Sequence, residues 1–136
     1  MVGVYRRLLT YWQNGNVGFN PGLVREPCQL SDIETDISTY PLYLLSLLSV
    51  ANGMDDNTEY DAEGFRFYSL KEVYRLSGSS LFVFADYLHE SWLYGVNDNG
   101  VFVIFNGIDN AELVASSMEA FLEHYLVNSD DIYPSI

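Results

Sequence analysis

The sequence predicts a single domain of the α+β class, residues 1–136, with an antiparallel sheet at its centre and helices before and after it. Two observations lead to this prediction. Aromatic and β-branched residues crowd both sides of an Asp98-Asn99-Gly100 turn within residues 81–113, which is typical of a β-hairpin. Apolar residues at helical spacing recur outside that stretch. A chain of this length buries a core without a disulfide or a metal.

The hairpin is predicted to pair residues 92–96 with residues 101–105. Aromatic and β-branched side chains lose rotamer freedom in a helix, so this composition favours strands. Residues 81–85 have the same character and should belong to the same sheet.

Three helices are predicted before the sheet. Residues 4–13 carry an apolar face made of Val4, Leu8, Tyr11 and Trp12. Ser31 and Glu34 have the spacing of a capping box and begin a short helix. Residues 41–51 begin with Pro41, which suits the first turn of a helix. This helix is apolar nearly all round, so it should be buried.

Further elements are predicted on both sides of the hairpin. Residues 65–68 read as a strand, and a capping box at Ser69 predicts a helix to about residue 76. Residues 112–115 favour another strand. A capping box formed by Ser116 and Glu119 then begins the last helix, whose apolar face is Met118, Phe121, Leu122 and Tyr125.

Charge limits the classes of partner. Nineteen acidic residues face six basic ones, for a net charge of −13, and no lysine or arginine follows Arg75. Such a surface repels nucleic acid and anionic membranes and attracts a basic protein, although net charge also serves solubility alone. The single Cys28, the absence of a signal-peptide pattern and an apolar run limited to residues 42–51 predict a cytoplasmic protein.

An acidic stretch at residues 55–63 is the first candidate site. It resembles a calcium loop, but its sixth position is Tyr60 rather than glycine and its twelfth is Arg66 rather than glutamate. It therefore reads as a solvated loop. Because its carboxylates have no basic neighbour, we expect either a solubility role or a binding face for a cationic partner, formed by Asp55, Asp56, Glu59, Asp61, Glu63 and Glu90.

A catalytic site is not predicted. Asp86 and His89 have the chemistry of a general acid–base pair, but no nucleophile motif, phosphate loop or third metal ligand accompanies them. We therefore expect no catalytic residue, metal site or cofactor. Tyr87, Trp92 and Tyr94 offer either a binding platform or core packing, and core packing is favoured for Trp92.

Three blocks in this order resemble the SUKH superfamily, which includes fungal regulators of the Smi/Knr type. The first runs from Tyr40-Pro41 to Ala51-Asn52-Gly53, the second covers residues 67–73, and the third spans residues 84–96, the hairpin and residues 117–122. The resemblance covers about residues 31–126. Tyr40 replaces the leucine usual before the proline, and Met54 stands where a second glycine often follows Asn-Gly.

The resemblance implies an α+β domain with a twisted, mostly antiparallel sheet flanked by helices. Many bacterial members are immunity proteins, which neutralise toxins that are often nucleases, and the family shares no catalytic constellation. We therefore expect a non-catalytic protein-binding domain, a monomer or weak homodimer, whose partner is a basic toxin domain. The alternatives are a small hydrolase or metal-dependent enzyme using Asp86, His89 and Glu90, and a regulatory scaffold domain.

Overall fold

The structure is a computed structural model that describes residues 2–13, 40–48, 65–68, 72–87, 91–104, 111–127 and 130–133. Helices and an antiparallel sheet make up this part of the chain, which confirms the predicted α+β class. Its elements are α1 (Val2–Gln13), α2 (Leu42–Leu48), β1 (Phe65–Phe67), β2 (Tyr74–Arg75), β3 (Phe82–Tyr87), β4 (Trp92–Asn97), β5 (Gly100–Ile104), β6 (Glu112–Ala115), α3 (Met118–Leu126) and the 3₁₀ turn η4 (Asp130–Ile132).

The sheet has the strand order β1-β3-β4-β5-β6, with β2 paired to the same edge of β3 as β1. The predicted hairpin is confirmed, because Leu93 pairs with Ile104 and Val96 pairs with Val101. The turn requires glycine at position 100. Its φ is +139°, and a Cβ there would lie 2.2 Å from the carbonyl oxygen of Ala115.

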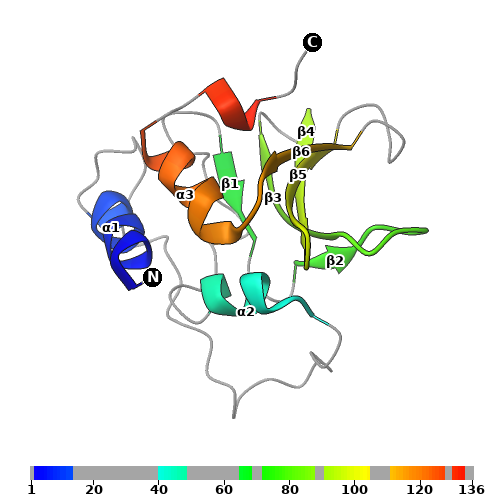
Figure 1. Cartoon of the computed structure of the whole chain (residues 1–136), viewed down its shortest axis with the longest axis horizontal. Coiled ribbons are helices and arrows are strands. Elements are labelled where there is room, and N and C mark those ends of the chain that lie inside the picture. The colour runs from blue at the N-terminus through cyan, green and yellow to red at the C-terminus, as the bar shows by residue number, and fades with distance from the viewer. Residues whose placement is uncertain are drawn as a thin grey trace.

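The helices cover one side of the sheet, called here the helix face. Figure 1 shows α3 between α1 and the sheet, with α2 beside both the sheet and α3. Aromatic rings fill this layer. The Phe121 ring lies 5.6 Å from Phe84 and 5.4 Å from Tyr94, and the Tyr125 ring lies 5.3 Å from Phe65. These strands and helices are held together by large side chains that are almost completely removed from water.

The helix α2 is apolar, as predicted, but it is not buried all round. Leu44 and Leu48 are 0% and 3% exposed, as predicted, but Leu42 is 76% exposed. The other six residues of α2 are buried or partly buried, so the exposure is confined to its first residue. Residues 49–51 of the predicted helix and its Asn52-Gly53 end lie outside the described residues, as does the capping box at Ser31. None of the described helices is both long and apolar enough to cross a membrane.

The helix predicted from Ser69 to residue 76 is wrong at its end. Tyr74 and Arg75 form β2, which pairs with Val83 and Phe82 of β3. Gly78, with φ +79°, reverses the chain between the two strands, and the Leu76 amide donates to the carbonyl of Leu81 over 2.8 Å. Hydrogen bonds to a neighbouring strand therefore outweigh the local capping signal.

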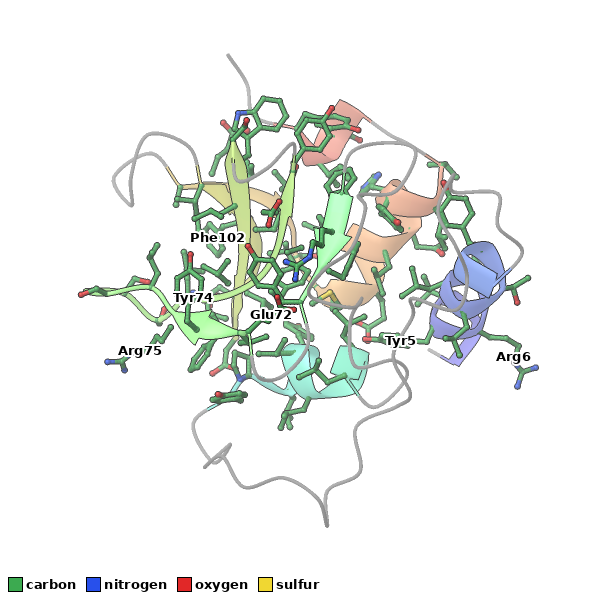
Figure 2. The ribbon with its side chains drawn as sticks, turned by 180° about the vertical axis from the view of Figure 1, so that it is seen from behind. Tyr5, Arg6, Glu72, Tyr74, Arg75 and Phe102 are labelled. Atoms are coloured by element: carbon green, nitrogen blue, oxygen red, sulfur yellow. The ribbon has the colours of Figure 1, made fainter. Side chains whose placement is uncertain are left out.

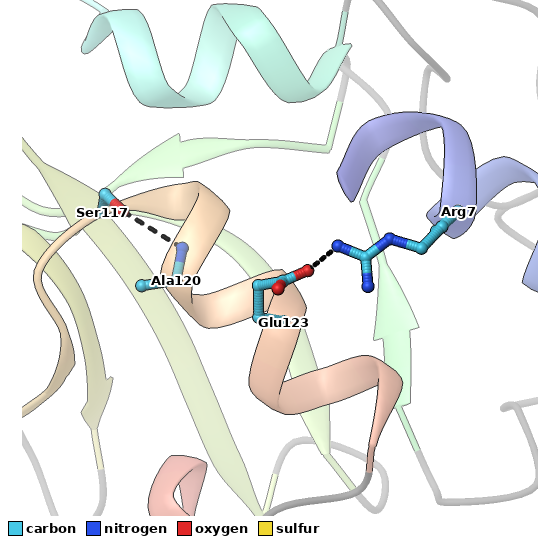
Figure 3. Close-up of polar contacts among 4 residues, drawn as sticks. All are labelled: Arg7, Ser117, Ala120 and Glu123. Carbon is cyan, nitrogen blue, oxygen red and sulfur yellow. Dashed lines mark hydrogen bonds and ion pairs between the residues drawn. The ribbon is translucent and has the colours of Figure 1, made fainter. Parts of the chain in front are cut away.

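The last helix begins one residue later than predicted. Its N-cap is Ser117, whose hydroxyl accepts a hydrogen bond from the Ala120 amide over 3.1 Å (Figure 3). The shift moves Glu119 out of the capping-box position. Its carboxylate instead accepts a hydrogen bond from the Tyr5 hydroxyl, 3.1 Å away, and so links α3 to α1.

Candidate functional site

No residue of the predicted binding face belongs to the part of the chain that the structure describes. Asp55, Asp56, Glu59, Asp61, Glu63 and Glu90 all lie outside the described residues, and so does His89. The acidic binding face therefore stays a prediction. Of the residues considered for catalysis, the structure describes Asp86.

Asp86 is buried, with 1% of its surface exposed. It lies on β3 directly opposite Arg66 of β1, and the register places both on the sheet side away from α3, called here the opposite face. The Tyr68 hydroxyl donates a hydrogen bond of 2.7 Å to Oδ2 of Asp86. One carboxylate oxygen is thus already engaged inside the protein.

Arg66 completes a polar cluster with the buried Tyr68 and Asp86 and the partly buried Glu72, called here the Arg66 cluster. Its guanidinium pairs with the Glu72 carboxylate and lies 5.2 Å from the centre of the Tyr68 ring. Burial lowers the pKa of Arg66, but the hydrogen bond and charge of Glu72, with the charge of Asp86, outweigh that effect and raise the pKa. Arg66 therefore stays charged between two carboxylates.

This geometry suits a structural role for Asp86. A general base must reach the proton it removes from a substrate, whereas the Asp86 carboxylate is buried and hydrogen-bonded within the cluster. Within the described ranges, no three histidine, cysteine, aspartate or glutamate side chains come together as a metal site.

A pocket of about 370 Å³ lies where the start of α2 meets the turns at one end of the sheet. Its polar groups already bond to one another. Asn97 donates to the Ser80 hydroxyl over 3.0 Å and accepts from the Asn99 amide over 2.8 Å. The pocket is lined by Pro41, Arg75, Ser80, Phe82, Asn97, Asp98 and Asn99. Because this lining includes one arginine and one aspartate, it favours neither a cationic nor an anionic ligand.

Aromatic rings gather at the end of the helix face where β3 finishes and β4 begins. Tyr87 and Trp92 are cross-strand partners, and their rings stack with centroids 4.8 Å apart and planes 10° apart. Tyr133, just after η4, packs against both, with centroids 5.4 Å and 5.9 Å away. All three side chains are half-buried, and we call them the aromatic end.

The three aromatic residues weighed as a platform therefore separate into two groups. Tyr94 is core: it is fully buried, and its hydroxyl donates a 2.6 Å hydrogen bond to the Ile132 carbonyl. Burial, followed by the proximity of Tyr133 and Tyr87, raises the pKa of Tyr94. Tyr87 and Trp92 are partly buried and pack against the core, as favoured for Trp92, while part of each side chain stays in contact with solvent.

Sequence reasoning missed Tyr133 and the pairing of the two rings. The pairing had a usable signal, because Tyr87 and Trp92 end and begin successive strands separated by residues 88–91. Antiparallel strands with so short a connection place such residues opposite each other. No local signal in the sequence indicated Tyr133, because its position depends on the path of the chain after α3.

Two of the four described arginines pair with carboxylates. Arg66 pairs with Glu72 within its cluster, and Arg7 of α1 pairs with Glu123 of α3 (Figure 3). Arg6 and Arg75 are exposed and point outward at opposite sides of the molecule (Figure 2). From β3 to the end of the chain, the only ionised side chains at neutral pH are carboxylates and any protonated histidine.

Comparisons with family models, with curated proteins and with solved structures give no match for this chain.

Proposed function

We propose that this chain is a non-catalytic protein-binding domain, an immunity protein that acts in the cytoplasm and neutralises a basic toxin domain such as a nuclease. The observation that carries the proposal is the charge. The net charge is −13, and two of the described arginines are already paired with carboxylates. Opposite potentials speed the encounter of two proteins and fix their register, so a basic partner suits this surface.

Two further considerations support a binding role. Asp86, the described member of the alternative enzymatic set, is buried and accepts a hydrogen bond from Tyr68. The ordered resemblance to the SUKH superfamily supplies the class of partner, because bacterial members commonly neutralise toxins. A hydrolase would need a carboxylate that the substrate can reach, and Asp86 does not provide one.

Co-expression with a basic toxin domain encoded beside the gene of this chain tests the proposal. We expect growth to be restored, and the two purified proteins to form a complex whose association slows steeply as salt is raised. If the toxin domain still kills cells that contain the folded chain, and the purified proteins do not associate, then the proposed function is wrong.

The same pair of proteins tests the acidic stretch at residues 55–63. Asp55→Asn, Asp56→Asn and Glu59→Gln together should slow association and flatten its salt dependence, while leaving thermal stability unchanged or slightly higher. A matched variant removes the same charge elsewhere, by Asp98→Asn, Glu112→Gln and Glu123→Gln. If both variants slow association equally, net charge is responsible; if the first has no effect, the stretch is not the binding face.

A further inference from the structure

We infer that the aromatic end, Tyr87, Trp92 and Tyr133, is a docking surface for an arginine or lysine side chain on a basic segment of a partner protein. The inference rests on the proposed function, since it names the chemistry by which the domain would hold a basic partner. It also assigns a role to three rings that remain partly exposed.

The exposure of these rings differs from that of their neighbours. On the same face, Phe65 and Tyr94 are at most 1% exposed, whereas Tyr87, Trp92 and Tyr133 each remain half-buried. Tryptophan and tyrosine are the side chains most enriched at the centres of protein interfaces, because one ring presents much rigid area.

The rings are held in place before any partner arrives. Trp92 stacks flat on Tyr87, and the Phe65 ring supports both Tyr87 and Tyr133, with centroids 5.0 Å and 6.1 Å away. The hydrogen bond from Tyr94 to the Ile132 carbonyl fixes the backbone next to Tyr133. A preformed surface loses little conformational entropy on binding, so its contacts count more fully towards affinity.

Charge selects a cation as the occupant. The Asp131 side chain, two residues before Tyr133, is 73% exposed, and its carboxylate lies 3.8 Å from Nδ1 of His124. No lysine or arginine follows Arg75, so the whole segment from β3 to the C-terminal end offers no cationic side chain of that type to these rings. The face of an aromatic ring attracts a guanidinium or ammonium group, and a nearby carboxylate adds to that attraction.

The chain already contains one such contact. The Arg66 guanidinium lies over the Tyr68 ring, with Glu72 and Asp86 completing its surroundings. The aromatic end offers rings of the same kind, and Asp131 precedes Tyr133 by two residues, while no arginine or lysine belongs to that part of the chain. Stacking of nucleic acid bases is the other common use of exposed rings, but a net charge of −13 repels the phosphates that accompany them.

A synthetic peptide of alternating arginine and glycine is the first probe, and the same peptide with citrulline in place of arginine is its uncharged control. We expect the arginine peptide to bind and to shift the indole Nε1–H signal of Trp92 in an NMR titration of the unmodified protein, assigned with Trp92→Phe. The citrulline peptide should do neither. Failure of the arginine peptide to shift that signal, or equal binding of both peptides, would overturn the inference.

Matched variants then separate a ring contact from general attraction to an acidic protein. Trp92→Leu should weaken arginine-peptide binding about tenfold, and Trp92→Phe less, because phenylalanine keeps a smaller aromatic face. Asp131→Asn should weaken it by a smaller factor. Phe102→Leu changes a half-buried ring on the opposite face and should leave affinity unchanged (Figure 2).

The two proposals fail differently. If a toxin domain binds this protein and folded Trp92→Phe and Asp131→Asn variants bind it with unchanged affinity, then the function stands and the aromatic end is not the contact. If the arginine peptide binds through Trp92 while the toxin domains encoded beside the gene do not bind, then the surface stands and the immunity role does not. If Trp92→Leu fails to fold, three measurements still test the inference: the shift of the Trp92 indole signal in the unmodified protein, and the binding of Trp92→Phe and of Asp131→Asn.

Discussion

Strands β1 and β3 bury both of their faces, but the two faces are built by different chemistry. On the helix face, Phe65 and Phe84 pack against rings from α3. On the opposite face, Arg66 and Asp86 are buried as well, although both are ionisable side chains. The comparison teaches that burial alone does not predict the effect of a substitution. An apolar residue loses area and packing, whereas a charged one leaves its partners uncompensated.

Removing a ring from the helix face should have the largest effect. Phe121→Ala deletes a side chain that contacts both Phe84 and Tyr94, and we expect a loss of roughly 3–5 kcal/mol in the free energy of unfolding. Urea denaturation measures it. Phe121→Leu, which keeps most of the volume, is the control and should cost less. Equal costs for the two variants would show that ring packing does not dominate this face.

Removing one charged side chain from the opposite face should lower the free energy of unfolding by about 3 kcal/mol. This value is the lower end of the range for breaking a buried ion pair, because Arg66 keeps Glu72 as a partner. Asp86→Leu tests this. Adding Arg66→Met to it should cost less than the sum of the two single substitutions, since the interaction between Arg66 and Asp86 can be lost only once. Strict additivity in this double-mutant cycle would mean that Arg66 and Asp86 do not depend on each other.

Tyr94 differs from its apolar neighbours, because it places one polar group, its hydroxyl, within the helix face. Tyr94→Phe should cost about 1 kcal/mol for the lost hydrogen bond to the Ile132 carbonyl. Its raised pKa means that the folded state holds the phenol proton more tightly than the unfolded state. This stability is complete below the unfolded pKa of about 10 and is lost as pH rises above it.

Denaturant unfolding near neutral pH and above pH 10 measures that dependence. The loss of stability at high pH should be shallower in Tyr94→Phe than in the unmodified protein. Some loss should remain, because burial and the charge of Glu119 also raise the pKa of Tyr5. Identical pH profiles for the two proteins would contradict the burial argument.

Breaking the exposed pair of Arg7 and Glu123 should have the smallest effect on the free energy of unfolding. It joins the same two residue types as the partly buried pair of Arg66 and Glu72, but its side chains are 57% and 50% exposed. Arg7→Ala should therefore change the free energy of unfolding by less than about 0.5 kcal/mol. A cost as large as that of Asp86→Leu would show that pairing, rather than burial, controls the strength of charged contacts in this chain.

Local patterns in the sequence were sufficient for several elements. Residues on both sides of Asn99-Gly100 pair as predicted, because turn type and strand composition act over a few neighbouring residues. The apolar spacing that buries Leu44 and Leu48 also acts within one helix. The acidic character of the chain is a property of composition alone, and it carries the proposed function.

Contacts between distant residues decided the rest. Tyr74 joins the sheet because β3 offers it hydrogen bonds, although the local signal favoured a helix. Asp86 became part of a polar cluster because Arg66 of β1 lies opposite it and Tyr68, just after β1, donates a hydrogen bond to it. Tyr133 reaches Trp92 only through the path of the chain after α3. Such contacts have no local signature, because their free energy comes from surfaces that meet only after the chain has folded.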